Sequence, residues 1–301
     1  MPRGNCRLCH EESELKLSHV VPAFVFRWQR ESSGNGHLRM ASAPNRRVQD
    51  GPKLHWLCDN CETLLSLSEG MFSNKIFHPL ILDAGRPVRY AEWMMHFCTS
   101  LSWRVLQYFM TEVEAKERTQ EQIEQMALAE KAWREVLLGQ RKHAGVFEQH
   151  FLPFDQIQNT TGTFPPNINR YLMRAVQIDL CFSEKGLYTY AKLGRFIILG
   201  FVHEPTPRHW IGTKVHATEG AIGPRDYTVP RGFGRYLNAK ASQAAKSLAS
   251  MSASQHDKVV QAFKQNIDKI DGSDLFVAMQ ADVAMFGDKA FIQNMPATKN
   301  S

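Results

Sequence analysis

Apolar positions in the first eighty residues change from short runs to a helical period. The runs Leu15 to Val21 and Lys53 to Leu57 are short and β-prone, which is typical of strands. Pro22 predicts a turn after the first run. From Asn60 the apolar residues recur with helical spacing to about Lys75, and His78-Pro79 predicts the end of that helix.

Two further helices are predicted in the middle of the chain. Residues 91–110 are apolar nearly all round, which predicts a buried helix. Residues 111–138 place apolar positions among Glu, Gln, Lys and Ala, which predicts a long amphipathic helix that ends at Gly139. Upstream, residues 23–31 favour a short helix or strand end, and residues 37–53 an extended or looped excursion.

The second half of the chain begins β-prone and ends helical. Residues 188–203 favour strands with a bulge or bend at Gly194 or Gly200, after a loop over 150–170. Shorter strands are expected at Trp210 to His216 and at Asp226 to Val229. Helices are expected over 235–251, from an N-cap at Ser254 to about 270, and from Ser273 to 286.

The composition is that of a water-soluble globular protein of 301 residues, with 43% hydrophobic and 22% charged residues. We expect no membrane span, because no run of about 18 apolar residues occurs. We also expect a cytoplasmic protein, because the N-terminus carries no apolar signal region.

Positive charge gathers in one part of the chain. Residues 185–246 hold ten Lys and Arg against three acids, a larger excess than the net charge of +6 for the whole chain. Such an excess fits a surface that attracts phosphate backbones, and it fits a merely soluble basic surface as well.

Cysteine spacing supplies the first specific chemistry. Cys6 and Cys9 form one C-x-x-C pair and Cys58 and Cys61 a second, and four thiolates on two tight turns suit a tetrahedral structural zinc ion. In the expected compartment, paired cysteines favour metal ligation over disulfides. Cys98 and Cys181 lie among apolar residues and are expected in the core.

Between the two pairs lies His19-Val20-Val21-Pro22, ten residues after Cys9. The order along the chain is a cysteine pair, then His-Val-Val-Pro, then a second cysteine pair before a predicted helix. In this order of features, residues 4–80 resemble the zinc-framed HNH (ββα-metal) endonuclease family. The resemblance implies a treble-clef module with a structural zinc and a second, catalytic divalent cation such as Mg²⁺. It also implies that His19 acts as the general base that activates water against a phosphodiester. The alternative is a buried His19 that braces the hairpin.

The sequence departs from the family pattern at positions that would bind the catalytic cation. Ser18 stands where an acid is often found, and a central Asn before the second pair is missing. The residue after the second pair is Glu62, which is a good magnesium ligand. Glu69 follows seven residues later on the same expected helix face, so Glu62 and Glu69 are candidate cation ligands or simply solvated acids.

Basic side chains supply candidate contacts to nucleic acid, although each also fits a solvated surface. They occur in the N-terminal module and in the basic half of the chain: Arg27, Arg46, Arg47, Lys192, Arg195, Lys214, Arg231 and Arg235.

Together these features predict an α+β protein in three parts. Residues 1–80 form the zinc-bound HNH-like module, 81–150 a helical region, and 151–301 an α/β domain that binds nucleic acid or a partner. We expect a metal-dependent endonuclease acting on nucleic acid, with DNA the expected substrate and bacterial phage defence a setting suggested by resemblance. The alternative is a catalytically inactive, zinc-stabilised module that binds nucleic acid or protein. A protein partner or a homo-oligomer stays open.

Overall fold

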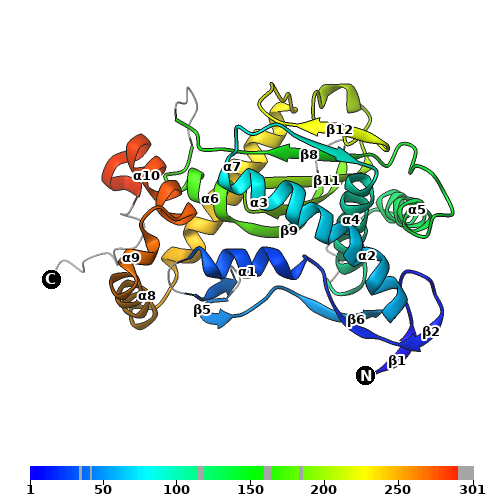
Figure 1. Ribbon diagram of the computed structural model, residues 1–301, viewed down its shortest axis with the longest axis horizontal. Coiled ribbons are helices and arrows are strands. Elements are labelled where there is room, and N and C mark those ends of the chain that lie inside the picture. The colour runs from blue at the N-terminus through cyan, green and yellow to red at the C-terminus, as the bar shows by residue number, and fades with distance from the viewer. Residues whose placement is uncertain (34–35, 41–42, 114–117, 159–163, 183–185, 291–301) are drawn as a thin grey trace. The chain divides into compact units, whose positions relative to one another are not determined.

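The computed structural model describes residues 1–33, 36–40, 43–113, 118–158, 164–182 and 186–290. Helices and antiparallel strands are mixed along the chain, which confirms the predicted α+β class (Figure 1). Among the described residues, no helix is long and apolar enough to cross a membrane.

The chain divides into two compact units, each assembled from three segments. Unit 1 contains Met1–Ala23, Gly51–Pro153 and Val176–Val229, and unit 2 contains Phe24–Asp50, Phe154–Ala175 and Pro230–Ser301. The sequence predicted consecutive parts with boundaries at 80 and 150. Strand pairing and helix packing between distant segments produce units that are discontinuous in sequence instead.

Unit 1 begins with two small antiparallel pairs and a helix. Strand β1 (Arg3–Asn5) pairs with β2 (Glu12–Glu14), and the first cysteine pair lies between them. Strand β3 (Lys16–His19) pairs with β6 (Lys53–Leu57), as the two apolar runs predicted. Helix α2 (Asp59–Phe72) follows β6 directly, and Cys58 is its N-cap residue. This ββα order is the one expected of the module.

The helical path continues beyond the predicted stop at Pro79. Helix α2 passes through a π-helical turn, η1 (Ser73–Phe77), into α3 (His78–Leu82). Pro79 stands in the first turn of α3, where a proline removes no helical hydrogen bond. The prediction that His78-Pro79 ends the helix was therefore wrong.

A four-stranded antiparallel sheet forms the centre of unit 1, in the order β8-β11-β10-β9. Its strands are β8 (Gln149–Pro153), β9 (Val176–Phe182), β10 (Leu187–Leu193) and β11 (Phe196–His203). Gly194, with φ +60°, lies in the turn that joins β10 to β11, a backbone conformation that favours glycine.

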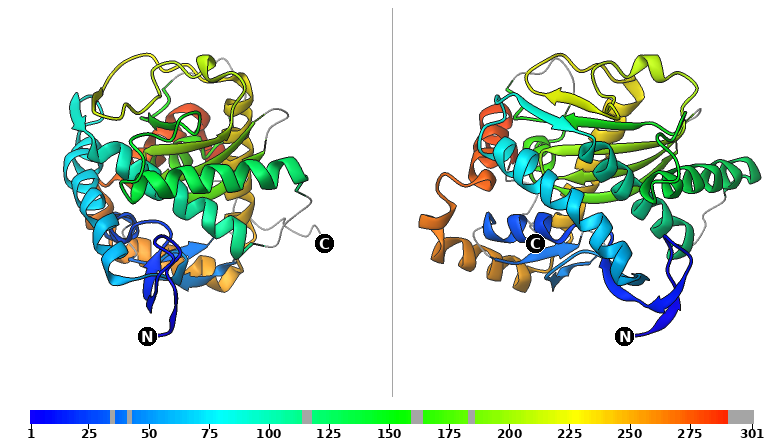
Figure 2. Two further views of the ribbon diagram at one scale, coloured as in Figure 1. Left: turned by 90° about the vertical axis from the view of Figure 1, so that its right-hand side faces the viewer. Right: turned by 45° about the vertical axis from the view of Figure 1, so that its right-hand side comes forward.

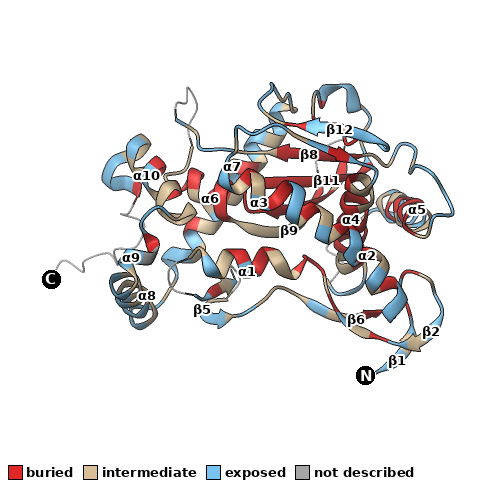
Figure 3. Cartoon of the chain, viewed as in Figure 1, coloured by how far each residue is buried: buried red, intermediate tan, exposed pale blue. Residues whose placement is uncertain are grey.

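Helix α4 (Trp93–Thr111) packs against this sheet and is buried over most of its length, as predicted (Figures 2 and 3). Gly200 in β11 permits the close approach, because a Cβ there would lie 2.6 Å from the Ser102 side chain of α4. Phe72 of α2 stacks on Phe97 of α4 with ring centroids 3.9 Å apart. The N-terminal module thus shares its core with the rest of unit 1.

Helix α5 (Gln120–Leu137) packs on α4 but begins later than residue 111, where the sequence placed its start. The Thr119 hydroxyl accepts a hydrogen bond from the Gln122 amide, and the Gln122 side chain accepts one from the Thr119 amide. This reciprocal cap defines the true N-terminus. At the other end, Gly139 has φ +70°, consistent with the predicted helix stop.

The remainder of unit 1 contains less strand than predicted. Strands β7 (Val88–Ala91) and β12 (Glu219–Ile222) pair with each other. The expected strands at 210–216 and 226–229 are absent from the described residues, and isolated bridges link His150 to Lys214 and Ile211 to Thr228. A short 3-10 turn, η2 (Pro207–His209), precedes them.

Unit 2 contains most of α1 (Ala23–Glu31), a two-stranded ribbon of β4 (Leu38–Met40) and β5 (Ala43–Val48), and a set of helices. Helix α6 (Ile168–Arg174) packs against α7 (Arg231–Ala249) and α10. The ribbon lies within residues 37–53, for which an extended or looped segment was predicted. Helix α7 also packs against β5.

The C-terminal helices of unit 2 are α8 (Ala253–Gln265), α9 (Ile267–Ile270) and α10 (Asp274–Phe286), followed by the 3-10 turn η3 (Gly287–Ala290). The predicted cap at Ser273 is confirmed, because its hydroxyl accepts a hydrogen bond from the Phe276 amide at 3.3 Å. The predicted cap at Ser254 was wrong, because the N-cap position of α8 is Ser252.

Candidate metal centre and ββα site

The four predicted zinc ligands come together in unit 1. The Sγ atoms all lie within 4.8 Å of one another, and they belong to Cys6, Cys9, Cys58 and Cys61. Tetrahedral zinc with Zn–S bonds of about 2.3 Å places its sulfur atoms about 3.8 Å apart. The Sγ atoms of Cys9 and Cys58 are 3.9 Å apart, so the cluster matches the size of a zinc site.

Local backbone geometry aims the thiols at one point. The amide of Cys61 donates to Sγ of Cys58, and the amide of Cys58 donates to Sγ of Cys6, at 3.5 and 3.4 Å. His10 closes the first turn with φ +65°, and its amide donates to the Cys6 carbonyl at 2.8 Å. The Arg7 amide bonds the Trp56 carbonyl, which ties the first turn to β6.

The electrostatics of the cluster also favour a cation. A hydrogen bond with Cys61 lowers the pKa of Cys6, while the pKa of Cys61 is raised by its bond to Cys6 and by burial. Thiols this close cannot all ionise unless a positive charge lies among them. A bound Zn²⁺ supplies that charge, so the donor set fits a structural zinc ion.

The candidate base His19 ends β3, where it pairs in register with Lys53. Its side chain is half-buried, and the Nε2 atom is shielded from solvent. The His19 carbonyl accepts a hydrogen bond from Nη1 of Arg104 at 3.1 Å. His55, also in β6, contacts the Leu15 carbonyl through Nδ1 at 3.0 Å and braces the same hairpin.

Helix α2 runs alongside β3 and carries both candidate acids. Lys16 pairs with Asp59 at 3.1 Å, which places the start of α2 beside the start of β3. Further along, Arg104 links Glu69 to the His19 carbonyl. Glu62 lies between Asp59 and Glu69 along α2 and shares a helix face with Glu69, so we call these three residues the acidic stripe.

Glu62 and Glu69 differ in what they contact. The Oε1 atom of Glu62 is buried and has no hydrogen-bond partner among the described residues. Glu69 instead pairs through Oε1 with Nη2 of Arg104 at 2.5 Å. The guanidinium of Arg104, only 4% exposed, therefore occupies the place next to Glu69 that the sequence assigned to a cation.

Among the described residues, the four cysteines are the only group of three or more His, Cys, Asp or Glu side chains close enough together to hold a metal ion. Ser18 is 2% exposed, and its hydroxyl contacts the Lys16 carbonyl at 3.4 Å. A magnesium ion usually binds one or two carboxylates plus substrate phosphates. The orphaned oxygen of Glu62 meets the protein part of that requirement, and Glu69 does not.

The predicted nucleic-acid contacts divide by burial. Lys192 is fully buried and its Nζ donates to the Gly194 carbonyl at 2.6 Å; Arg195 is 7% exposed. Neither offers a surface contact, because both side chains are buried. Lys214 pairs with Glu148 and keeps half of its side chain exposed. The remaining candidates are exposed: Arg27, Arg46 and Arg47, and Arg231 and Arg235.

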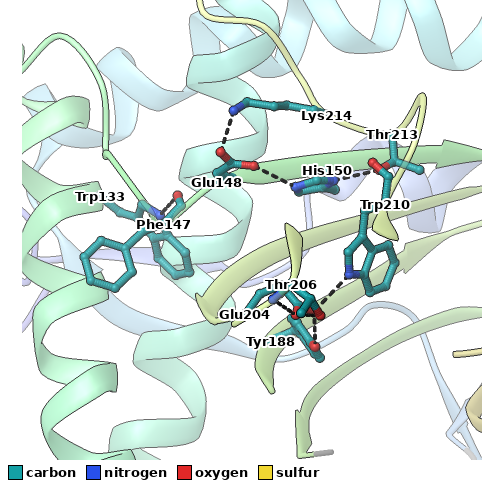
Figure 4. A network of polar contacts seen from close by, with 10 residues as sticks. All are labelled: Trp133, Phe147, Glu148, His150, Tyr188, Glu204, Thr206, Trp210, Thr213 and Lys214. Carbon is teal, nitrogen blue, oxygen red and sulfur yellow. Dashed lines mark hydrogen bonds and ion pairs between the residues drawn. The ribbon is translucent and has the colours of Figure 1, made fainter. Parts of the chain in front are cut away.

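Two groups of buried polar side chains were not predicted from the sequence. One is Arg104, the only Lys, Arg, Asp or Glu in α4. The other is a polar network at the edge of the central sheet (Figure 4). There His150, 1% exposed, contacts the Thr213 hydroxyl at 2.7 Å and Glu148 at 3.3 Å. Burial lowers the pKa of His150, so the neutral imidazole fits here.

The network holds a loop rather than an accessible site. Thr213 is 1% exposed, and its hydroxyl contacts the Trp210 carbonyl. Next to it, the Glu204 carboxylate accepts hydrogen bonds from Tyr188 and from the Trp210 indole, at 2.5 and 2.9 Å (Figure 4). These contacts fasten the segment after β11 to the sheet, and no sequence motif marks them.

Neither a protein-family model, nor a curated protein, nor a solved structure matches this chain. The HNH resemblance therefore rests on the sequence motif in residues 4–80.

Proposed function

We propose that the N-terminal ββα module is an HNH-type, metal-dependent endonuclease that hydrolyses phosphodiester bonds in nucleic acid. The observation that carries the proposal is the arrangement around the cysteine cluster. The cluster frames β3, β6 and α2 so that His19 and Glu62 belong to one module, and Glu62 presents a buried carboxylate oxygen without a partner.

The structural zinc holds the two turns, and a hard divalent cation when bound would neutralise charge on the leaving oxygen. Glu62 would hold that cation together with oxygens of the substrate phosphate. His19 removes a proton from water, the resulting hydroxide attacks phosphorus, and the P–O bond to the leaving oxygen breaks. A histidine base suits this role near neutral pH.

Plasmid cleavage in Mg²⁺ or Mn²⁺ tests the proposal. We expect wild-type cleavage and a loss of at least about 100-fold in His19→Ala, as for removal of a general base. Glu62→Gln should lose cleavage and need more metal. His209→Ala and Glu121→Gln are matched controls, because both residues are exposed and lie outside the module. Equal cleavage by wild type and His19→Ala would contradict the role of His19.

A second function is favoured by one specific observation. The Arg104–Glu69 ion pair places a permanent cation at the His19 end of the acidic stripe. With Ser18 in place of an acid, this arrangement also suits a zinc-stabilised binding module without activity. Salt-dependent binding of nucleic acid with no cleavage of DNA or RNA under any divalent cation would establish that alternative.

A further inference from the structure

The β4–β5 ribbon of unit 2 carries positive charges that repel one another. Arg39 on β4 lies directly opposite Arg47 on β5 in the antiparallel register. Like charges at opposed positions destabilise a strand pair. Arg46 adds a third charge one residue before Arg47, on the opposite face of the ribbon because successive strand side chains alternate, and both residues are exposed.

Neighbouring groups do not cancel these charges. The Arg39 guanidinium donates to the Pro44 carbonyl at 3.0 Å and to Oε1 of Gln255 at 3.3 Å, and both acceptors are neutral. Nη1 of Arg47 lies 3.1 Å from Nε2 of His37. Among the described residues, neither Arg39 nor Arg46 nor Arg47 forms an ion pair with a carboxylate. Burial and the charge of Arg47 lower the pKa of Arg39.

The adjoining helix extends this basic character. Helix α7, which packs against β5, has no acidic residue in its 19 positions. Its basic residues are Arg231, Arg235, Lys240 and Lys246. Asn45 of β5 accepts a hydrogen bond from the Ser252 amide at 2.8 Å, just beyond the end of α7. The ribbon is therefore anchored to an acid-free helix.

An uncompensated cluster on two strands suits a polyanion with regularly spaced charges. We propose that the β4–β5 ribbon binds duplex DNA, with Arg39, Arg46 and Arg47 as the contacting side chains. The B-DNA major groove admits a two-stranded ribbon, whereas the deep, narrow groove of A-form RNA does not. Single strands are usually bound on aromatic side chains, and the described ribbon residues include none. The inference deepens the proposed function by assigning its substrate a second contact surface.

Fluorescence anisotropy with a labelled duplex of about 20 base pairs tests the inference on the full chain, without added divalent cation. The variant Arg46→Gln/Arg47→Gln is compared with Lys131→Gln/Lys142→Gln, which removes the same charge from exposed positions of unit 1. We expect the ribbon variant to bind at least about tenfold more weakly, and its salt slope to become shallower by about 2. The control pair should bind as wild type does.

Three results would overturn the inference: wild-type affinity in the ribbon variant, equal affinity of wild type for duplex RNA or single-stranded DNA, and equally effective competition by polyglutamate. Hydrogen exchange of the wild-type chain gives a measurement independent of any variant. Bound duplex DNA should protect amides of residues 43–48, and unchanged exchange there would also overturn it.

The outcomes separate binding from catalysis. Wild-type chain that binds duplex DNA through the ribbon but never cleaves would refute the endonuclease and support the ribbon. If the ribbon variant binds duplex DNA with wild-type affinity and still cleaves it, the proposed DNA contact of the ribbon is refuted and the endonuclease is supported.

Discussion

Arg104 connects the predicted site to the core of unit 1. It is nearly fully buried, and its guanidinium contacts Glu69, the His19 carbonyl and Ser100. A buried charge keeps its place only when its hydrogen bonds are met, because desolvation is expensive. One side chain therefore links the end of β3 to the last turn of α2.

Replacing Arg104 with Met should destabilise the fold by about 3 kcal/mol, because Glu69 then loses its partner in a largely dry site. Glu69→Gln should cost less, since its amide oxygen still accepts a hydrogen bond. Urea unfolding of both single variants and of the double variant measures the coupling. Additive losses would show that the ion pair contributes no specific stability.

Glu148 should make stability depend on acid pH. Its hydrogen bond to His150 and its pairing with Lys214 lower the pKa of Glu148 from 4.5 to about 2. A carboxyl with a lowered folded-state pKa stabilises the fold above the unfolded-state value, and that contribution is lost as pH falls from about 4.5 to about 2.

The difference in unfolding free energy between wild type and Glu148→Gln should therefore be largest above pH 4.5 and shrink towards pH 2. Thermal unfolding across this range measures it. A Glu148→Gln difference that stays constant with pH would contradict the assigned pKa.

At the scale of elements, the cysteine cluster joins pieces too small to fold alone. Strands β1, β2, β3 and β6 have three to five residues each. Isolated hairpins of this length are marginal in water, so the module needs a further constraint. Four thiols converging from two turns provide it when a metal is bound.

We expect one zinc ion per chain, and its removal should unfold the module. Cys58→Ser should lose zinc and part of the helical circular dichroism signal, because a zinc ligand is removed while serine can still cap α2. Elemental analysis measures the metal. Cys181→Ala, a buried cysteine outside the cluster, should keep one zinc ion. Zinc retained in Cys58→Ser would rule out the proposed ligand set.

At the scale of the molecule, the ββα module is part of the core of unit 1. Phe72 of α2 stacks on Phe97 of α4 and meets Phe151 and Phe196 of the sheet edge-on. Aromatic clusters of this kind contribute through buried area and through ring geometry. Damage to the central sheet should therefore reach the candidate site.

The approach of α4 to the sheet depends on Gly200. Gly200→Ala should destabilise the fold by about 1–3 kcal/mol, because the added methyl group would overlap Ser102 and Thr189. Gly70→Ala is the matched control in α2, where nothing lies within 4 Å, and it should be neutral or stabilising by about 0.5–1 kcal/mol. Urea unfolding measures both. If both variants change the free energy of unfolding equally, the contact at Gly200 does not limit how closely α4 approaches the sheet.

The amino-acid sequence by itself determined the local features. The C-x-x-C spacing identified the metal ligands, and apolar periodicity identified α2, α4 and the strands β3 and β6, because both depend on residues close together in the chain. Only the tertiary structure determined how far Lys192, Arg104 and Glu69 are buried and which groups their side chains contact. Whether a charged side chain meets solvent, a cation or another side chain depends on elements packed from far away in sequence. For the same reason the contact between Arg104 and the His19 carbonyl, 85 positions apart in the chain, could not be predicted from the sequence.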